Sequence, residues 1–329
     1  MTFTRRHCLA VLGAGLAKAA NKPLMDEWRK IAAGTDGTVG AAALHLPSGQ
    51  HVALNGQVAY PLASVCKLPI AMHILQMVDD GKLRLDQEIE IVPQDVWHSW
   101  EGDIGERWVR QHRWKLDDLI RLMVAESDNT AVHTLFRIGG TAGGMANSFG
   151  RWKVKGVRVD RYEGECYLAS HGVANPPPFD QWRPGLLEEL VRKTPLHQQA
   201  AGMRKLLADP RDTGTPEATV ELLARAFRGE LLSPGGTQRL KQVLEATSTG
   251  KARLKGLLPP DTAVAHKTGS TSTVNGLNGA TNDVGVMLLP VKAGQLAIAV
   301  YVKGSTRSET IREQVIARIA RVAYDRWTA

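Results

Sequence analysis

Ser64 and Lys67 could form a nucleophile and its proton acceptor. They lie three positions apart in Ser64-Val65-Cys66-Lys67, and residues at that spacing share one face of a helix, so the amine can reach the hydroxyl. The start of such a helix also presents amide groups that stabilise a developing negative charge. The pattern alone is weak, because about one such match is expected by chance in a chain of this length. A second copy at 248–251 is polar and typical of a loop.

Two further short motifs could contribute polar groups to the same site. Ser127-Asp128-Asn129 follows a segment with an apolar helical face, and Lys267-Thr268-Gly269-Ser270 follows the strand-like run TAVAH. Each motif alone fits an ordinary turn at the end of a helix or a strand. All three motifs in this order are much less probable by chance, which favours one site assembled from distant segments.

The ordered trio resembles that of the class A serine β-lactamases, whose fold is shared with the penicillin-binding DD-peptidases. The resemblance extends beyond the motifs and covers most of residues 25–329; it is carried by YPLASVCKLPIAMHILQMVDDGKLRLD, MVAESDNTAVHTLF, RDTGTPEATVELL, VAHKTGS and NGATNDVGVMLLP. It implies an enzyme that hydrolyses the β-lactam amide through an acyl-serine intermediate and thereby gives antibiotic resistance.

The resemblance also implies roles for the catalytic residues. Ser64 would attack the lactam carbonyl, and Lys67 would assist removal of its proton, directly or through water. Ser127 would relay a proton to the departing lactam nitrogen. Arg161-Tyr162-Glu163 matches the family's Ω loop, 36 residues after Ser127, so Glu163 would be the base that activates water for deacylation.

The substrate-binding residues follow from the same resemblance. Asn129 would hold the substrate's side-chain amide, and the Lys267 cation with the Thr268 hydroxyl would bind the substrate carboxylate. The backbone N–H groups of Ser64 and Ser270 would form the oxyanion hole. The substrate-binding set implied in this way is Asn129, Tyr167, Lys267, Thr268, Gly269 and Ser270.

Two residues next to Glu163 depart from the family pattern. Gly164 stands where the family usually has a proline, often after a cis bond; a cis bond before glycine costs roughly 2.5–4 kcal/mol, so the loop either tolerates that strain or takes another path. Tyr167 stands where the family usually has an asparagine that positions the hydrolytic water. Glu165 matches a structural position of the family.

A third departure is an insertion near residues 168–208. Lys267 follows Ser127 by 140 positions, roughly three dozen more than the family pattern. The extra segment contains two predicted helices, around GLLEELVRK and HQQAAGMRKLLA. It is either a lid or binding loop, or a tolerated surface excursion. Beside the site, Trp97 or Trp100 either walls the cleft or packs in the core.

The surrounding elements predict an α+β fold. Residues 39–54 and 284–302 each predict two strands joined by a turn, and the last twenty residues predict an amphipathic helix with Ile311, Val315, Ile316, Ile319 and Val322 on one face. We expect an antiparallel sheet built from residues 20–61 and 218–329 and flanked by the terminal helices. Residues 62–217 would form an all-helical domain, with the active site between the two. GGTAGG at 139–144 is interpreted as a turn that ends a helix.

Composition and the N-terminus limit the other possibilities. Residues 1–19 carry Arg5-Arg6, an apolar run and Ala17-Lys18-Ala19, a pattern typical of a twin-arginine export signal, which predicts a periplasmic or secreted protein. The net charge of +8 is scattered, so no nucleic-acid partner is expected. No run is long enough to span a membrane.

We expect a monomer with a small-molecule β-lactam substrate and no cofactor. The histidines are dispersed and no His-Glu-x-x-His occurs, so no metal is expected. In the family fold Cys66 and Cys166 approach each other, and they either form a disulfide or remain two buried thiols. The alternative to a β-lactamase is a DD-peptidase-like or penicillin-binding acyl-serine protein with slow or no deacylation.

Overall fold

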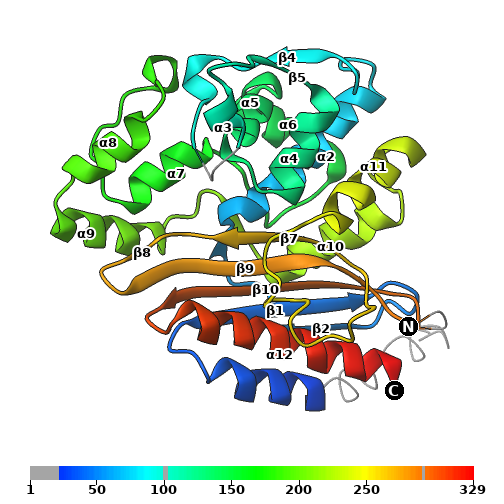
Figure 1. Cartoon of the computed structure of the whole chain (residues 1–329). Coiled ribbons are helices and arrows are strands. Elements are labelled where there is room, and N and C mark those ends of the chain that lie inside the picture. The colour runs from blue at the N-terminus through cyan, green and yellow to red at the C-terminus, as the bar shows by residue number, and fades with distance from the viewer. Residues whose placement is uncertain (1–21, 99–102, 291–292) are drawn as a thin grey trace, which may run out of the picture.

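The architecture is a central antiparallel sheet covered by helices on both faces (Figure 1). The structure is a computed structural model and describes residues 22–98, 103–290 and 293–329. The strand order is β2-β1-β10-β9-β7, with β8 beside β9. These strands are β1 (Thr38–His45), β2 (His51–Leu54), β7 (Val264–Ser270), β8 (Thr273–Val274), β9 (Leu277–Leu288) and β10 (Gln295–Ser305). The predicted export signal, residues 1–19, lies outside the described residues.

The remaining elements are mostly helices. Two short ladders pair β3 (Tyr60–Pro61) with β6 (Thr213–Gly214) and β4 (Glu88–Glu90) with β5 (Arg113–Lys115). One helix spans residues 22–32. The others are α2 (Lys67–Asp79), α3 (Ile104–Arg107), α4 (Leu116–Ala125), α5 (Asn129–Ile138), α6 (Thr141–Trp152), α7 (Glu163–Ser170), α8 (Leu186–Lys193), α9 (Leu196–Leu206), α10 (Pro216–Phe227), α11 (Pro234–Glu245) and α12 (Glu309–Thr328), with 3-10 turns η1 (Ala63–Cys66), η2 (Pro93–Asp95) and η3 (Phe179–Gln181).

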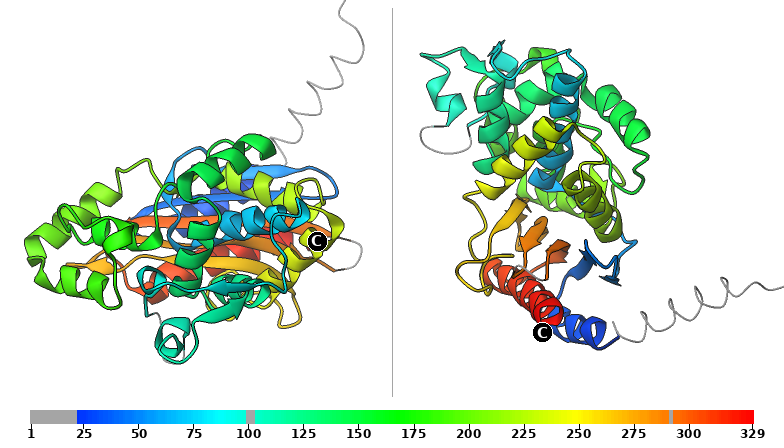
Figure 2. Two further views of the ribbon diagram at one scale, coloured as in Figure 1. Left: turned by 90° about the horizontal axis from the view of Figure 1, so that it is seen from above. Right: turned by 90° about the vertical axis from the view of Figure 1, so that its right-hand side faces the viewer.

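The sheet is apolar on both faces, because successive residues of a strand point to opposite sides. On β1, Ala41 and Ala43 face the terminal helices, whereas Ala42 and Leu44 face the helical half of the molecule. Figure 2 shows α12 and the helix of residues 22–32 side by side under the strands. The indole N–H of Trp28 donates to the carbonyl of Ile319 at 3.2 Å and joins these two helices. The predicted α+β fold, an antiparallel sheet flanked by the terminal helices, is confirmed.

The helical half surrounds α2, which is buried from Lys67 to Gln76 and contacts α4, α5, α6 and α11.

The prediction that residues 139–144 form a turn ending a helix was only half right. Gly139 and Gly140 do end α5, but α6 begins at once, so Gly144 lies inside a helix. A Cβ on Gly144 would lie 1.8 Å from the carbonyl oxygen of Gly139. Glycine is therefore needed because the first turn of α6 lies so close to the end of α5, rather than for a turn.

The insertion folds as α8 and α9, and both predicted helices are present. Figure 1 shows them beyond α7, at the end of the sheet where β8 lies. Helix α9 contacts α7 and β9. A Cβ on Gly202 would lie 2.2 Å from the backbone nitrogen of Gly172, so α9 approaches the chain after α7 almost backbone to backbone.

Candidate active site

The segment that carries Ser64 is a single 3-10 turn leading into α2. Ser64 lies in η1 and Lys67 is the first residue of α2, and residues three apart are eclipsed in a 3-10 turn. Ala63 has a φ of 48°, a strained value for a residue with a Cβ. The side-chain amide of Asn282 donates to the carbonyls of Pro61 and Leu62 at 2.8 and 3.1 Å, which holds the approach to this turn.

Lys67 joins the other predicted catalytic residues. Its side chain is fully buried. Nζ donates to the carbonyl of Ser127 and to Oδ1 of Asn129, both at 2.8 Å, and forms an ion pair with Oε2 of Glu163 at 3.0 Å. One ammonium group therefore ties together α2, α7 and the loop before α5.

Glu163 is in direct contact with the predicted nucleophile. It is the first residue of α7, and its Oε1 accepts a hydrogen bond from Ser64 Oγ at 2.6 Å. Burial raises the pKa of this carboxyl, but the charge of Lys67 and the hydrogen bonds from Ser64 and Lys67 outweigh burial and lower the pKa overall. The group is thus held as a carboxylate, the form that can accept a proton.

Ser127 lies between two buried lysines. Its φ of 61° places it in the left-handed region, and its Oγ accepts from Lys267 Nζ at 3.0 Å and from Lys67 Nζ at 3.2 Å. Since ammonium groups only donate, the proton of this hydroxyl is left for a third partner. Burial and the nearby charge of Lys67 lower the pKa of Lys267 to about 7.

Strand β7 brings the third motif against η1. A Cβ on Gly269 would lie 2.5 Å from the carbonyl oxygen of Leu62, so glycine allows the strand to pass close to the nucleophile turn. The hydroxyls of Thr268 and Thr249 are 2.7 Å apart. Ser270 Oγ accepts from Arg253 Nη2 at 2.7 Å.

These segments enclose a cavity of about 430 Å³. Of the predicted residues, Ser64, Ser127, Asn129, Glu163, Tyr167 and Ser270 line it. Lys67, Lys267 and Thr268 do not line it, but each has a hydrogen bond to a residue that does. The insertion and its flanks also contribute, through Cys166, Ser170, Leu206 and Arg211.

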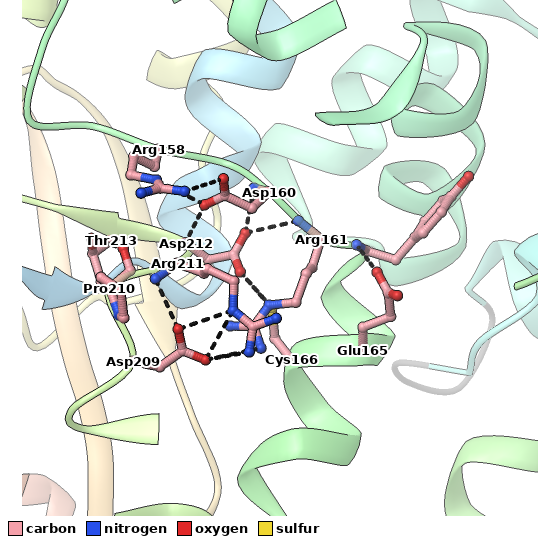
Figure 3. A network of polar contacts seen from close by, with 11 residues as sticks. Arg158, Asp160, Arg161, Glu165, Cys166, Asp209, Pro210, Arg211, Asp212 and Thr213 are labelled. Carbon is pink, nitrogen blue, oxygen red and sulfur yellow. Dashed lines mark hydrogen bonds and ion pairs between the residues drawn. The ribbon is translucent and has the colours of Figure 1, made fainter. Parts of the chain in front are cut away.

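A charged cluster joins the two ends of the Ω loop, the segment that contains Glu163 (Figure 3). Arg161 Nε donates to Asp212 Oδ2 at 2.6 Å, and Asp212 Oδ1 accepts from the backbone N–H groups of Asp160 and Arg161 at 2.7 and 3.0 Å. Asp209 adds an ion pair with Arg161 at 3.3 Å. The insertion therefore lies inside this closed segment and enlarges the Ω loop itself.

Both departures next to Glu163 now have a structural account. The described residues contain no cis peptide bond, so the loop takes another path than one with a cis bond before Gly164. A Cβ on Gly164 would lie 2.6 Å from the Trp182 ring. Tyr167 lies one turn after Glu163 and packs against Trp97, with ring centroids 5.1 Å apart. Trp97 lines the cavity, whereas Trp100 lies outside the described residues.

Cys66 and Cys166 are free thiols, so the disulfide alternative does not hold in this structure. Cys66 is buried, and Cys166 donates weakly to Asp212 Oδ2 at 3.4 Å. Burial raises the pKa of both thiols well above the usual value, which disfavours the reactive thiolate.

Sequence reasoning missed several residues that shape the site. Arg253 is buried, pairs with Glu313 of α12 and donates to Ser270, which fixes the end of β7. The loop at 248–251 was set aside as a chance match, yet its Thr249 lines the cavity. No local signal in the sequence marked this loop, because Arg253 is one of three basic residues close together, with Lys251 and Lys255. In the described parts of the chain no cluster of His, Cys, Asp and Glu is arranged to hold a metal ion. Nor does any described helix combine the length and apolarity of a membrane span.

Comparison with known proteins agrees with this geometry. Residues 23–327 match the model of the β-lactamase enzyme family. The extended-spectrum β-lactamase PER-1 of Pseudomonas aeruginosa is 29% identical over 96% of this chain and 91% of its own length. The crystal structure of a β-lactamase from Chitinophaga pinensis is 32% identical, with a TM-score of 0.76 over 92% of this chain and 98% of that one. An ancestral class A β-lactamase is 27% identical, with a TM-score of 0.73 over 92% of this chain and 99% of that one. The ordered motifs, the buried lysines and the antiparallel sheet with β7 beside the nucleophile turn thus have one explanation: this chain belongs to the β-lactamase enzyme family.

Proposed function

We propose that this protein is a class A serine β-lactamase that opens the lactam ring through an acyl-serine intermediate and then hydrolyses that intermediate. The observation that carries the proposal is the contact of 2.6 Å between Ser64 Oγ and the Glu163 carboxylate. A nucleophile beside a base is the arrangement that nucleophilic catalysis requires. Because Glu163 and Ser64 lie on different segments, the same base can also activate water in the second, hydrolytic step.

In the first step Ser64 attacks the lactam carbonyl carbon. Its proton passes to the Glu163 carboxylate, which it already contacts, or to Lys67 as Lys67 passes one of its own protons to Ser127. The carbonyl oxygen becomes negative in the tetrahedral intermediate and is stabilised by the backbone N–H groups of Ser64 and Ser270. The carbon–nitrogen bond then breaks, and Ser127 delivers its proton to the nitrogen. Lys67, which contacts both Ser127 and Glu163, replaces that proton with the one taken from Ser64, so Glu163 is a carboxylate again before hydrolysis. The two lysines that donate to Ser127 stabilise its oxygen during this transfer.

In the second step water replaces the serine. Glu163 takes a proton from the water as its oxygen attacks the ester carbonyl, and Ser64 leaves and regains a proton. The lowered pKa of Glu163 keeps it ionised for this purpose. Lys67 holds the second carboxylate oxygen at 3.0 Å and so orients the base.

Substrate binding would use the rest of the cavity wall and the buried polar groups directly behind it. Lys267 and Thr268 bind the substrate carboxylate, Asn129 holds the side-chain amide, and Gly269 keeps β7 close to the nucleophile turn. The acyl side chain would lie between Tyr167 and Leu206, because both line the cavity and Leu206 comes from the inserted α9. The insertion is then a binding element rather than a surface excursion.

The protein would act outside the cytoplasm. This part of the proposal rests on the twin-arginine pattern and on Ala17-Lys18-Ala19 in residues 1–19. Without that segment the chain keeps the sheet, the helical half and every proposed site residue.

A chromogenic cephalosporin tests the function directly. Sustained turnover, with many molecules of product for each molecule of enzyme, is the expected result. A burst of product equal to the enzyme concentration, followed by silence, would indicate a penicillin-binding sensor that is acylated and not released. Release of D-alanine from a peptide without turnover of the cephalosporin would indicate a DD-peptidase.

A further inference from the structure

His133 is a buried imidazole that the mechanism above does not use. It lies one turn after Asn129 on α5, and its side chain is 1% exposed. Its ring stacks on Trp97 with centroids 5.5 Å apart and meets Trp182 at the same distance. A polar ring enclosed by aromatic side chains needs hydrogen-bond partners for both nitrogens.

One partner lies next to the proposed base. The backbone N–H of Gly164 donates to His133 Nε2 at 3.0 Å. Gly164 is the second residue of α7, where a backbone N–H has no acceptor within its own helix. Because this N–H donates, Nε2 must carry a lone pair and the ring proton must be on Nδ1. Nδ1 then donates to the carbonyl of Asp95 at 3.2 Å.

The far end of this chain of hydrogen bonds is fixed. Asp95 is fully buried, and its carboxylate accepts from Arg137 Nε at 3.0 Å and from Arg137 Nη2 at 2.5 Å. The N–H of Val92 donates to the same carboxylate at 3.2 Å. The imidazole therefore connects the first turn of α7 to a rigid part of the helical half.

Gly164 and His133 complement each other. A proline, the residue usual at this position in the family, would have no N–H to donate. In this chain Gly164 provides an N–H at that position, and His133 provides the acceptor for it. No side chain can replace the hydrogen of Gly164, since a Cβ would lie 2.6 Å from Trp182 and 2.8 Å from Leu187.

We infer that His133 is a positioning residue for hydrolysis: in its neutral Nδ1–H form it holds the Gly164 N–H and so fixes the Glu163 carboxylate against Ser64 and the attacking water. The inference rests on the proposed function. Burial lowers the pKa of His133 to about 4, and the charges that face it, Glu163 and Lys67, act in opposite directions. The ring is therefore neutral at neutral pH and can accept.

The first test uses the unaltered protein. ¹⁵N chemical shifts of the imidazole distinguish a protonated from an unprotonated ring nitrogen. We expect His133 to carry its proton on Nδ1 and none on Nε2 at pH 7. A proton on Nε2 would overturn the inference, because that nitrogen could not then accept from Gly164.

The second test separates the two chemical steps. His133→Leu removes the acceptor at similar size, whereas His133→Gln keeps an amide oxygen. In the leucine variant we expect deacylation to slow at least about tenfold, and acylation by no more than about threefold since Lys67 remains as an acceptor. The glutamine variant should recover deacylation to within about threefold of the unaltered protein.

Stopped-flow absorbance and mass measurement of the acyl-enzyme give both rate constants. Equal loss in both steps without recovery in the glutamine variant would overturn the inference, as would unchanged deacylation in the leucine variant. If the leucine variant does not fold, the ¹⁵N shifts of the unaltered protein still test whether His133 Nε2 can accept the hydrogen bond from Gly164. If the unaltered protein acylates without turnover, the proposed function fails, while the nitrogen shifts still decide on His133.

Discussion

The hydroxyl of Ser64 donates directly to the carboxylate of Glu163 over 2.6 Å. The proposed nucleophile and the proposed base of hydrolysis are therefore already in contact in the free protein. One carboxylate can take the serine proton in the first step and the water proton in the second. In the proposed mechanism Lys67 is an alternative acceptor for the serine proton, whereas hydrolysis depends on Glu163.

Glu163→Gln should therefore trap the acyl-enzyme. Deacylation should fall by about 10³-fold, whereas acylation should fall by about tenfold because Lys67 can still accept the serine proton. Mass measurement after mixing with a penicillin should show one substrate bound per chain. The matched control is Glu165→Gln, since Glu165 lies on the same helix and accepts the backbone N–H of Tyr162 rather than a hydrogen bond from Ser64. Unchanged turnover in Glu163→Gln would remove this residue from its role.

Substrate binding should weaken as the pH rises through about 7, the value to which burial and Lys67 lower the pKa of Lys267. Below that pH Lys267 is a cation and attracts the substrate carboxylate; above it the amine is neutral. We expect kcat/KM to fall by about tenfold per pH unit on the alkaline side, because only the protonated fraction binds. In Lys267→Arg the guanidinium stays charged, so the fall should move to higher pH. The same alkaline limb in both proteins would assign it to another group.

The side chain of Leu206 should control which acyl groups enter. Leu206→Trp fills the space beside α9, so kcat/KM should fall about tenfold for substrates with a bulky acyl side chain and less than about threefold for those with a small one. Steady-state rates on penicillins with one nucleus and graded side chains measure this. Leu196→Trp is the control, because Leu196 lies on the same helix and is 74% exposed. An equal fall for all side chains would argue against a binding role for α9.

A point substitution is a sharper test than removal of the insertion. Trp182, Leu187 and Met203 are all buried, so a chain without residues 174–205 would lose part of its core along with any binding surface. Loss of folding could not then be separated from loss of binding.

The elements with strong periodicity were predictable from the sequence. The hairpin of β1 and β2 and the amphipathic α12 are where the apolar pattern places them. The three motifs converge on one cavity, as their order in the chain indicated. These predictions succeeded because each depends on a pattern within a few residues or on a family resemblance.

Contacts between distant polar residues could not be predicted. Arg161 and Asp212 are 51 positions apart, and nothing in either local sequence specifies the other. The need for Gly164 depends on Trp182 and Leu187, which reach it only because the insertion folds back. His133 was one of ten dispersed histidines, and its acceptor role depends on an N–H of another helix.

The pairing of β1 with β10 has a consequence for how the molecule is made. The two strands are adjacent in the sheet, yet they are far apart in the sequence. The first strand must wait for its neighbour until every residue between them has been synthesised, and such distant pairing slows folding. A chain that stops before residue 295 would lack the centre of its sheet, so termination at that point should leave no partly working product.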